Sequence, residues 1–169
     1  MLSRIHNTIE KFIDWTGRAV AWLTLVMVLV TFFVVFMRYV FDSGSIAVQE
    51  SVSFMHALVF LVGAAYTLKH NEHVRVDIFY QKLSDIGKAW INLLGSLFIL
   101  MPVLVFIIWS SWGYVSDSWR ILESSGETGG LPGIYLLKSF ILVMAGLLIL
   151  QGLAEILKAI LVLRKRVSS

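Results

Sequence analysis

The sequence predicts an all-α integral membrane protein with four transmembrane helices. Only 15% of its 169 residues are charged and 58% are hydrophobic, whereas soluble domains carry about 25% charged residues. At ~1.5 Å per residue, a helix of about 20 apolar residues crosses a bilayer core. The hydrophobic residues occur in long runs of this size, separated by polar segments. We therefore expect a single membrane domain, residues 1–169, with spans at residues 19–37, 51–68, 89–116 and 134–154.

Two amphipathic segments are predicted to lie in the plane of the inner membrane surface. In residues 1–17, apolar side chains recur at helical spacing on one face and charged side chains take the other face. In residues 77–88, apolar side chains recur at steps of three and four, and Asp77 is placed to cap the helix. Both segments are too short and too charged to span. They predict an N-terminal amphipathic interfacial helix and a second short interfacial helix between spans two and three.

The third span is the longest of the four. Residues 89–116 contain no charged residue in twenty-eight positions, which exceeds one perpendicular crossing and predicts a tilted helix. Pro102 lies near the middle of this run and is expected to kink the helix, because proline cannot donate a backbone hydrogen bond. Residues 117–133, which follow, are rich in glycine and serine and predict an irregular loop.

The positive charges predict the orientation of the spans. Eleven of the fourteen Lys and Arg residues lie in or beside the N-terminal segment, the segment between spans two and three, and the basic tail at residues 155–169. The other three lie in or beside the connectors 39–50 and 117–133. Cytoplasmic loops of membrane proteins carry an excess of Lys and Arg. Both termini are therefore predicted to be cytoplasmic.

The composition excludes several kinds of chemistry. The absence of cysteine rules out disulfides, thiol catalysis and iron–sulfur centres. No serine-hydrolase, zinc-protease or phosphate-loop motif occurs, so neither an enzyme nor a cofactor is predicted. Lys69 and Arg75 oppose a cation in the polar segment, so a solvated loop is favoured over a metal site there. The candidate metal ligands of that segment are His70, Glu72, His73 and Asp77.

Two other functions are kept as alternatives: a stand-alone four-helix carrier, and a haem- or quinone-linked membrane subunit. A carrier needs an ionisable group near the middle of the membrane, and a bis-histidine haem needs paired histidines deep in the spans. His56 is the only histidine in a predicted span, and no predicted span has a central acid. An accessory or scaffolding membrane subunit is therefore favoured.

The polar residues in or near the spans are interpreted as structural. His56 is expected to donate a hydrogen bond between helices rather than to relay protons. Asn92 and Gln151 are expected to make interhelical contacts, and Glu155 is expected to pair with Lys158. A charged group at the outer ends of spans one and two has two open interpretations, an intrachain brace or contacts to a partner. It comprises Arg38, Asp42 and Glu50.

The order of four short motifs resembles the small, four-helix membrane subunit of tripartite ATP-independent periplasmic (TRAP) transporters. Arg-Tyr-Val-Phe at residues 38–41 closes span one, and Glu50 opens span two. Gly-Ala-Ala-Tyr at residues 63–66 lies late in span two, and His-Val-Arg-Val-Asp at residues 73–77 follows it. The resemblance covers nearly the whole chain, and the motif at residues 73–77 is its most specific part.

The resemblance implies a scaffold subunit of a sodium-coupled, binding-protein-dependent transporter that imports an organic anion, of the carboxylate or sulfonate class. Its partners would be a large transport subunit, which carries the sodium and substrate sites, and a periplasmic substrate-binding protein. The location would be the bacterial inner membrane, and no cofactor, metal or substrate site is expected in this chain. The residues expected to contact the partners are Arg38, Asp42, Glu50, His73, Arg75, Asp77, Glu123 and Glu127.

Overall fold

The computed structural model describes residues 2–70, 80 and 82–167, with side chains as far as Arg164. This part of the chain is helical and contains no β-strand, only an isolated antiparallel bridge between Ser124 and Pro132. Its elements are α1 (Leu2–Phe41), α2 (Ile46–Lys69), α4 (Asp85–Gly95), η1 (Ser96–Leu100), α5 (Met101–Arg120) and α6 (Ile134–Val167).

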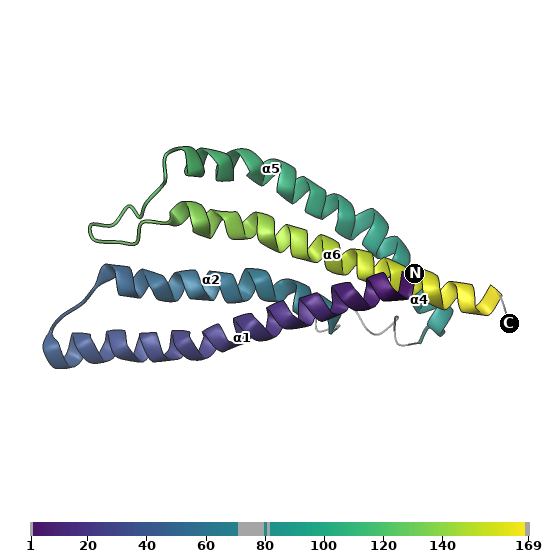
Figure 1. Cartoon of the computed structure of the whole chain (residues 1–169), viewed down its shortest axis with the longest axis horizontal. Helices are drawn as coiled ribbons and strands as arrows, with labels where there is room; N and C mark the ends of the chain where they lie inside the picture. Colours follow the sequence, from purple (N-terminus) through teal and green to yellow (C-terminus); the bar gives the residue numbers. More distant parts are fainter. Residues whose placement is uncertain (1, 71–79, 81, 168–169) are drawn as a thin grey trace.

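The helices form an elongated bundle made of two antiparallel hairpins (Figure 1). One hairpin is α1–α2 and the other is α5–α6, and α6 lies between α2 and α5. Both chain termini lie at one end of the bundle, which we call the termini end. The connections at residues 42–45 and 121–133 lie at the opposite end, which we call the loop end.

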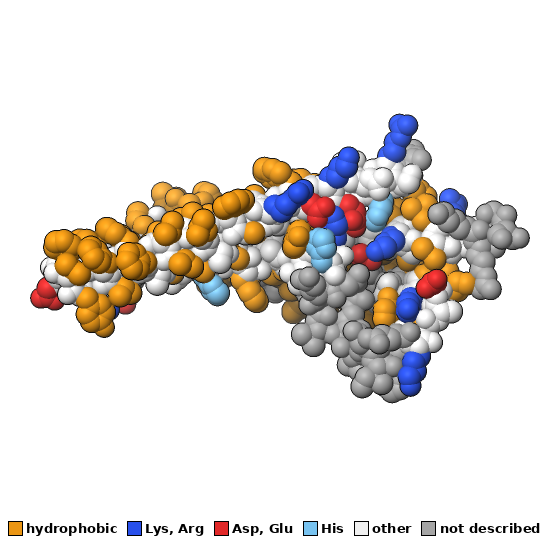
Figure 2. Space-filling view, turned by 90° about the horizontal axis from the view of Figure 1, so that it is seen from below, with side chains coloured by type: hydrophobic (Ala, Val, Ile, Leu, Met, Phe, Trp, Pro, Cys, Tyr) orange, Lys and Arg blue, Asp and Glu red, His pale blue; other side chains and the backbone are white. Residues whose placement is uncertain are grey.

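Four helical segments are long and apolar enough to cross a membrane, which confirms the predicted all-α, four-span fold class. On the face shown in Figure 2, hydrophobic side chains cover much of the elongated bundle, whereas charged side chains gather mainly toward the termini end. This distribution matches a bilayer around the middle of the bundle, because lipid tails solvate apolar side chains and not charged ones. The four segments are Leu2–Phe41, Ile46–Lys69, Asp85–Arg120 and Ile134–Arg164.

The first helix differs from the prediction of a separate interfacial helix at residues 1–17. Instead, α1 runs from Leu2 to Phe41 without interruption. Ile13 is fully buried and Val20, seven residues later, is also buried. Because seven residues are about two helical turns, the same face of α1 packs on the bundle on both sides of the expected break.

The predicted interfacial helix at residues 77–88 falls partly on residues outside the described part, Asp77 among them. In the described part, α4 begins at Asp85, and the Ser84 hydroxyl caps it by accepting a hydrogen bond from the Gly87 N–H at 3.3 Å. Residues 82–84 form a turn and bend before it. Ser84 therefore caps the helix that leads into the third span, and a single helix over residues 77–88 is interrupted at residues 82–84.

Proline in the third span is accommodated by a change in helix winding. The π-helical turn η1 precedes Met101, whose N–H bonds to the Ser96 carbonyl five residues earlier. Pro102 has no N–H, so it cannot bond to the Phe98 carbonyl as an α-helix requires. A π-helical turn is a known way to absorb such an interruption. The turn packs closely on α6, because a Cβ added to Gly152 would lie 3.0 Å from the Leu100 Cδ2.

The buried core is small and lies where α1, α2 and α6 meet. Its members are all aliphatic, and Tyr66 and several leucines pack around them. Many other large apolar side chains are exposed, as expected for a protein whose surroundings are lipid. The core residues are Ile13, Val20, Val62, Ala65 and Leu147.

Candidate functional site

A glutamate at the loop end ties the two hairpins together. Glu50, in the first turns of α2, accepts one hydrogen bond from the Ser125 hydroxyl and a second from the Leu131 N–H at 2.6 Å. Both partners belong to the loop between α5 and α6, which itself is closed by a hydrogen bond from the Ser125 N–H to the Leu131 carbonyl at 3.1 Å. We call Glu50 and these two loop residues the loop clamp.

The loop clamp leaves no room for a side chain at Gly130. A Cβ at this position would lie 2.5 Å from the Ser125 Cβ and 2.8 Å from the Glu50 Oε2. The contact partners of Glu50 are 75 and 81 residues away in the sequence. No local pattern therefore predicts the clamp, although the glycine-rich loop predicts that a tight turn occurs.

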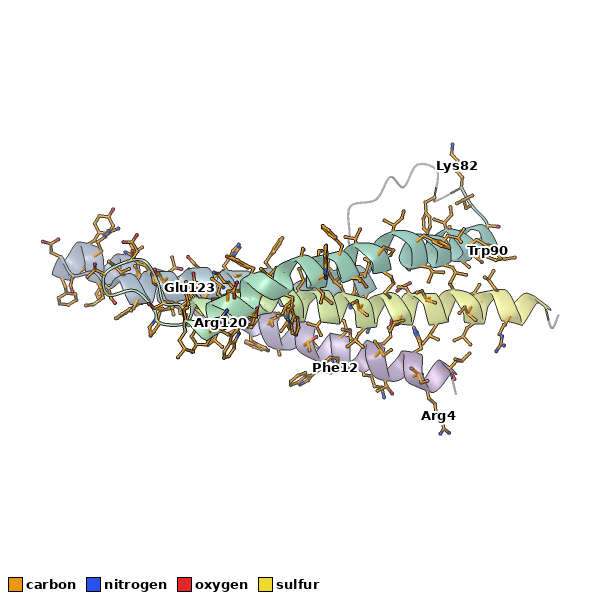
Figure 3. The ribbon with its side chains drawn as sticks, turned by 90° about the horizontal axis from the view of Figure 1, so that it is seen from above. Arg4, Phe12, Lys82, Trp90, Arg120 and Glu123 are labelled. Carbon is orange, nitrogen blue, oxygen red and sulfur yellow. The ribbon has the colours of Figure 1, made fainter. Side chains whose placement is uncertain are left out.

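A second group joins α5 to α6 next to the loop clamp. Lys138 forms an ion pair with Glu123, and its Nζ lies 4.0 Å from the centre of the Tyr114 ring. The Trp119 indole N–H donates to the Ser139 hydroxyl at 2.8 Å. Figure 3 shows Glu123 just beyond the end of α5, on the side opposite to Lys82 and Trp90 along the bundle. The Lys138 ammonium holds the pKa of the Glu123 carboxyl below its ordinary value.

The residues expected to contact partners at the loop end fall into two sets. Glu50 and Glu123 are engaged within the chain, as described above. Arg38, Asp42 and Glu127 are exposed, and none of their side chains takes part in an ion pair within the described residues. Glu50 is thus an intrachain brace, but its partners are in the loop and not Arg38 or Asp42. The remaining expected contacts, His73, Arg75 and Asp77, lie outside the described residues.

At the termini end, a charged network fastens α1 to α2. The Lys69 ammonium lies 2.6 Å from the Asp14 carboxylate, 3.2 Å from the Glu10 carboxylate and 3.0 Å from the Glu10 carbonyl oxygen. His70 adds a contact of 3.4 Å from its Nε2 to Asp14, and its ring lies against that of Tyr66 with centroids 4.3 Å apart. The Lys69 side chain is only 11% exposed. We call these charged residues the termini clamp.

The termini clamp changes the interpretation of the first seventeen residues. They were predicted to lie in the plane of the membrane surface, yet the charged Glu10 and Asp14 contact α2 and bind Lys69. His6 also contacts the bundle, with its Nδ1 3.2 Å from the Ala154 carbonyl oxygen of α6. Gly17 makes the close approach possible, because a Cβ there would lie within 2.7 Å of the Tyr66 Cβ.

Three predictions about polar residues in the second half need correction. Glu155 is buried and accepts a hydrogen bond from the Gln151 side chain at 3.4 Å, while no ion pair joins it to the exposed Lys158 in the described part of the chain. Gln151 therefore bonds within its own helix rather than between helices. Asn92 exchanges hydrogen bonds with the Tyr80 hydroxyl, with the amide nitrogen 2.9 Å away, so its partner precedes α4 and is not in another span.

The two clamps and the Lys138–Glu123 pair serve to join elements of the bundle. Among residues 2–70, 80 and 82–164, no group of three potential metal ligands lies close enough to hold an ion. Of the four candidate ligands from the sequence, only His70 lies in the described part, and it faces Asp14. What the arrangement can do is hold the two hairpins together at the loop end and hold α1 against α2 at the termini end.

Comparison with known proteins gives two findings. Residues 27–162 match the protein-family model described as the DctQ component of tripartite ATP-independent periplasmic transporters. The chain is 32% identical over 116 residues to the C4-dicarboxylate TRAP transporter small permease protein DctQ of Vibrio cholerae, an alignment that covers 67% of this chain and 46% of that protein. The chain thus spans about half the length of this curated relative. No solved structure matches the chain.

Proposed function

The chain belongs to the DctQ component family of tripartite ATP-independent periplasmic transporters, and we propose that it anchors a large transport subunit as a static scaffold. The observation that carries this proposal is the use of polar groups at both ends of the bundle. The loop clamp and the termini clamp fix helices to one another within the chain. A component of a transporter that must stay still while its partner moves requires such internal bracing. The family is a transport component and not an enzyme.

The finer features of the proposed function follow from the family. We infer that the complete transporter lies in the bacterial inner membrane, is driven by sodium and imports an organic anion. A carboxylate is supported by the name of the Vibrio cholerae relative, which specifies C4-dicarboxylates. Sodium and substrate would bind to the large subunit. With both termini in the cytoplasm, the loop end faces the periplasm, where the exposed Arg38, Asp42 and Glu127 are available to a substrate-binding protein.

Affinity purification tests the proposal. A tagged chain, expressed in its own host and extracted in mild detergent, is expected to co-purify with a large multi-span membrane protein identified by mass spectrometry. Liposomes that contain both proteins, together with the binding protein, should take up a radiolabelled carboxylate when sodium is present outside. If the chain purifies alone and transports the solute by itself, the scaffold function is wrong and the stand-alone carrier is correct. Haem absorption in the pure chain would support the redox-linked alternative instead.

A further inference from the structure

A groove on the membrane-facing surface of the α1–α2 hairpin contains a histidine. Its volume is about 490 Å³, and it opens sideways between the two helices. The α1 side contributes Met27, Val28 and Thr31, and the α2 side contributes Val52, Ser53 and His56. The groove is therefore largely apolar, with polar groups from both helices along its walls.

His56 lies at a depth where it would meet hydrocarbon. It is six residues from Glu50 and thirteen from Lys69 on α2, or roughly 9 Å and 20 Å along the helix axis. Its side chain is exposed, and no hydrogen bond from it to another described residue is formed. By contrast, the nearby Thr31 hydroxyl is satisfied by the Met27 carbonyl at 2.7 Å. An unpaired imidazole facing lipid is costly, because acyl chains neither donate nor accept hydrogen bonds.

The face of α2 that carries His56 points away from the rest of the chain. Ala65, in the buried core, lies nine residues later, which is about 180° around the helix. α6 packs on α2 through the core on that opposite face, so it does not reach His56, and α4 and α5 pack on α6 rather than on α2. Gly63 lies seven residues after His56 and shares its face, and a Cβ added there would meet nothing within 4 Å. A small residue such as glycine beside a polar side chain is typical of helix–helix contacts in membranes, because the helices can approach closely and form a hydrogen bond.

We propose that the α1–α2 groove receives a transmembrane helix of the large transport subunit, and that His56 forms a hydrogen bond to a polar group on that helix. This inference rests on the proposed function, which supplies the large subunit. A neutral imidazole has one donor and one acceptor nitrogen, so the partner helix carries a hydroxyl, amide or carboxyl group at this depth. The open space over Gly63 lets the backbones of the two helices approach closely.

Photo-crosslinking in the host membrane locates the partner. Benzoylphenylalanine replaces Phe60, which is 72% exposed four residues after His56, and in a matched variant replaces Trp109, which is 76% exposed on α5. The Phe60 variant is expected to give an adduct in which mass spectrometry identifies the large subunit, and the Trp109 variant is expected to give none. An adduct with the large subunit from Trp109 and not from Phe60 overturns the inference, and so does an adduct of two copies of this chain from Phe60.

Substitutions then test the contact itself. His56→Leu is expected to weaken association with the large subunit roughly 3- to 15-fold, the effect of losing one hydrogen bond between membrane helices. Gly63→Leu should reduce co-purification further by filling the approach surface, whereas Gly113→Leu on α5, where a Cβ also meets nothing within 4 Å, should not reduce it. Unchanged affinity in both the His56 and Gly63 variants overturns the inference.

The two proposals fail in distinguishable ways. If the wild-type chain co-purifies with the large subunit but neither variant on α2 weakens the complex, the scaffold function stands and the groove is not the interface. If the wild-type chain does not co-purify with a large subunit, the proposed function fails and the inference fails with it. Circular dichroism of each purified variant shows that the helices are intact.

Discussion

The close approach of α1 to α2 at Gly17 gives a sharp prediction of stability. In Gly17→Ala, the new Cβ would lie 2.7 Å from the Tyr66 Cβ and closer still to two of the ring carbons. Non-bonded carbons prefer about 3.5–4.0 Å, so the helix or the ring must move by about 1 Å or more. Such overpacking costs about 1–3 kcal/mol. Replacing a glycine by alanine inside a helix stabilises the helix by about 1 kcal/mol, which offsets part of this cost.

Gly63→Ala is the matched control for this variant. It lies in the interior of α2, where an added Cβ meets nothing within 4 Å, so it has the gain in helix propensity without the steric cost. The difference in unfolding free energy between the two variants therefore isolates the contact with Tyr66, at about 1–3 kcal/mol. Denaturant-induced unfolding of the isolated chain in detergent micelles, followed by circular dichroism, measures this difference.

Repeating the measurement in a protein that lacks the Tyr66 ring separates the contact with that ring from other effects of an alanine at position 17. Tyr66→Ala removes the ring carbons nearest to the new Cβ but keeps the Tyr66 Cβ. In this background the penalty of Gly17→Ala should shrink without vanishing. If Gly17→Ala unfolds at the same denaturant concentration as Gly63→Ala in the wild-type background, α1 and α2 do not meet at this glycine and the reasoning is refuted.

Three further predictions concern the two clamps and the ion pair between Glu123 and Lys138. Glu50→Ala should speed proteolytic cleavage of the loop between α5 and α6, while Glu50→Gln, which can still accept one hydrogen bond, should have a smaller effect; equal rates in all three proteins would contradict the loop clamp. Lys69→Met should lower the unfolding free energy by about 1.5–3 kcal/mol by removing charge-assisted hydrogen bonds, whereas Lys11→Met, at an exposed position, should leave it nearly unchanged. Because the folded pKa of Glu123 is lowered, its ion pair stabilises the loop at neutral pH and this stabilisation is lost as the pH falls through that pKa. In wild type, loop cleavage should therefore become faster as the pH falls through the pKa of Glu123. Lys138→Gln should abolish this pH dependence, and a pH dependence that persists in the variant would show that the Glu123–Lys138 ion pair is not its cause.

The four spans could be predicted because their cause is contained in the sequence. A membrane of fixed thickness requires uncharged runs of a certain length, and residues 51–68 or 134–154 show such runs directly. Pro102 likewise indicated a disturbance of the third span, which the structure shows as the π-helical turn η1. These features depend on a residue and its near neighbours alone.

The clamps could not be predicted because they depend on how the helices pack. Lys69 is 59 residues from Glu10, and no spacing rule connects residues so far apart. The same dependence on packing explains why residues 1–17 were predicted as a separate interfacial helix, whereas they form the first part of the continuous helix α1. A helix with one charged and one apolar face is expected on a membrane surface, but here the charged face finds Lys69 on α2. Glu155 was expected to pair with Lys158, and only the packing of α6 shows that it is buried and bonded to Gln151 instead.

The π-helical turn has a consequence for the register between the third span and α6. Inward-facing residues on either side of it recur every four positions, at Ser96, Leu100, Leu104 and Ile108, whereas an α-helix with 3.6 residues per turn would drift out of phase at this spacing. The wider turn absorbs part of that drift, so a continuous 36-residue segment keeps one side against its neighbour. Deleting one residue within η1 would let the wide turn close into an ordinary α-helical turn, whereas deleting one residue of α4 after Trp90, outside the wide turn, would rotate the start of α4 by about 100° relative to α5. Ala89 would then leave α6, and Trp90 would turn to a new side of the bundle.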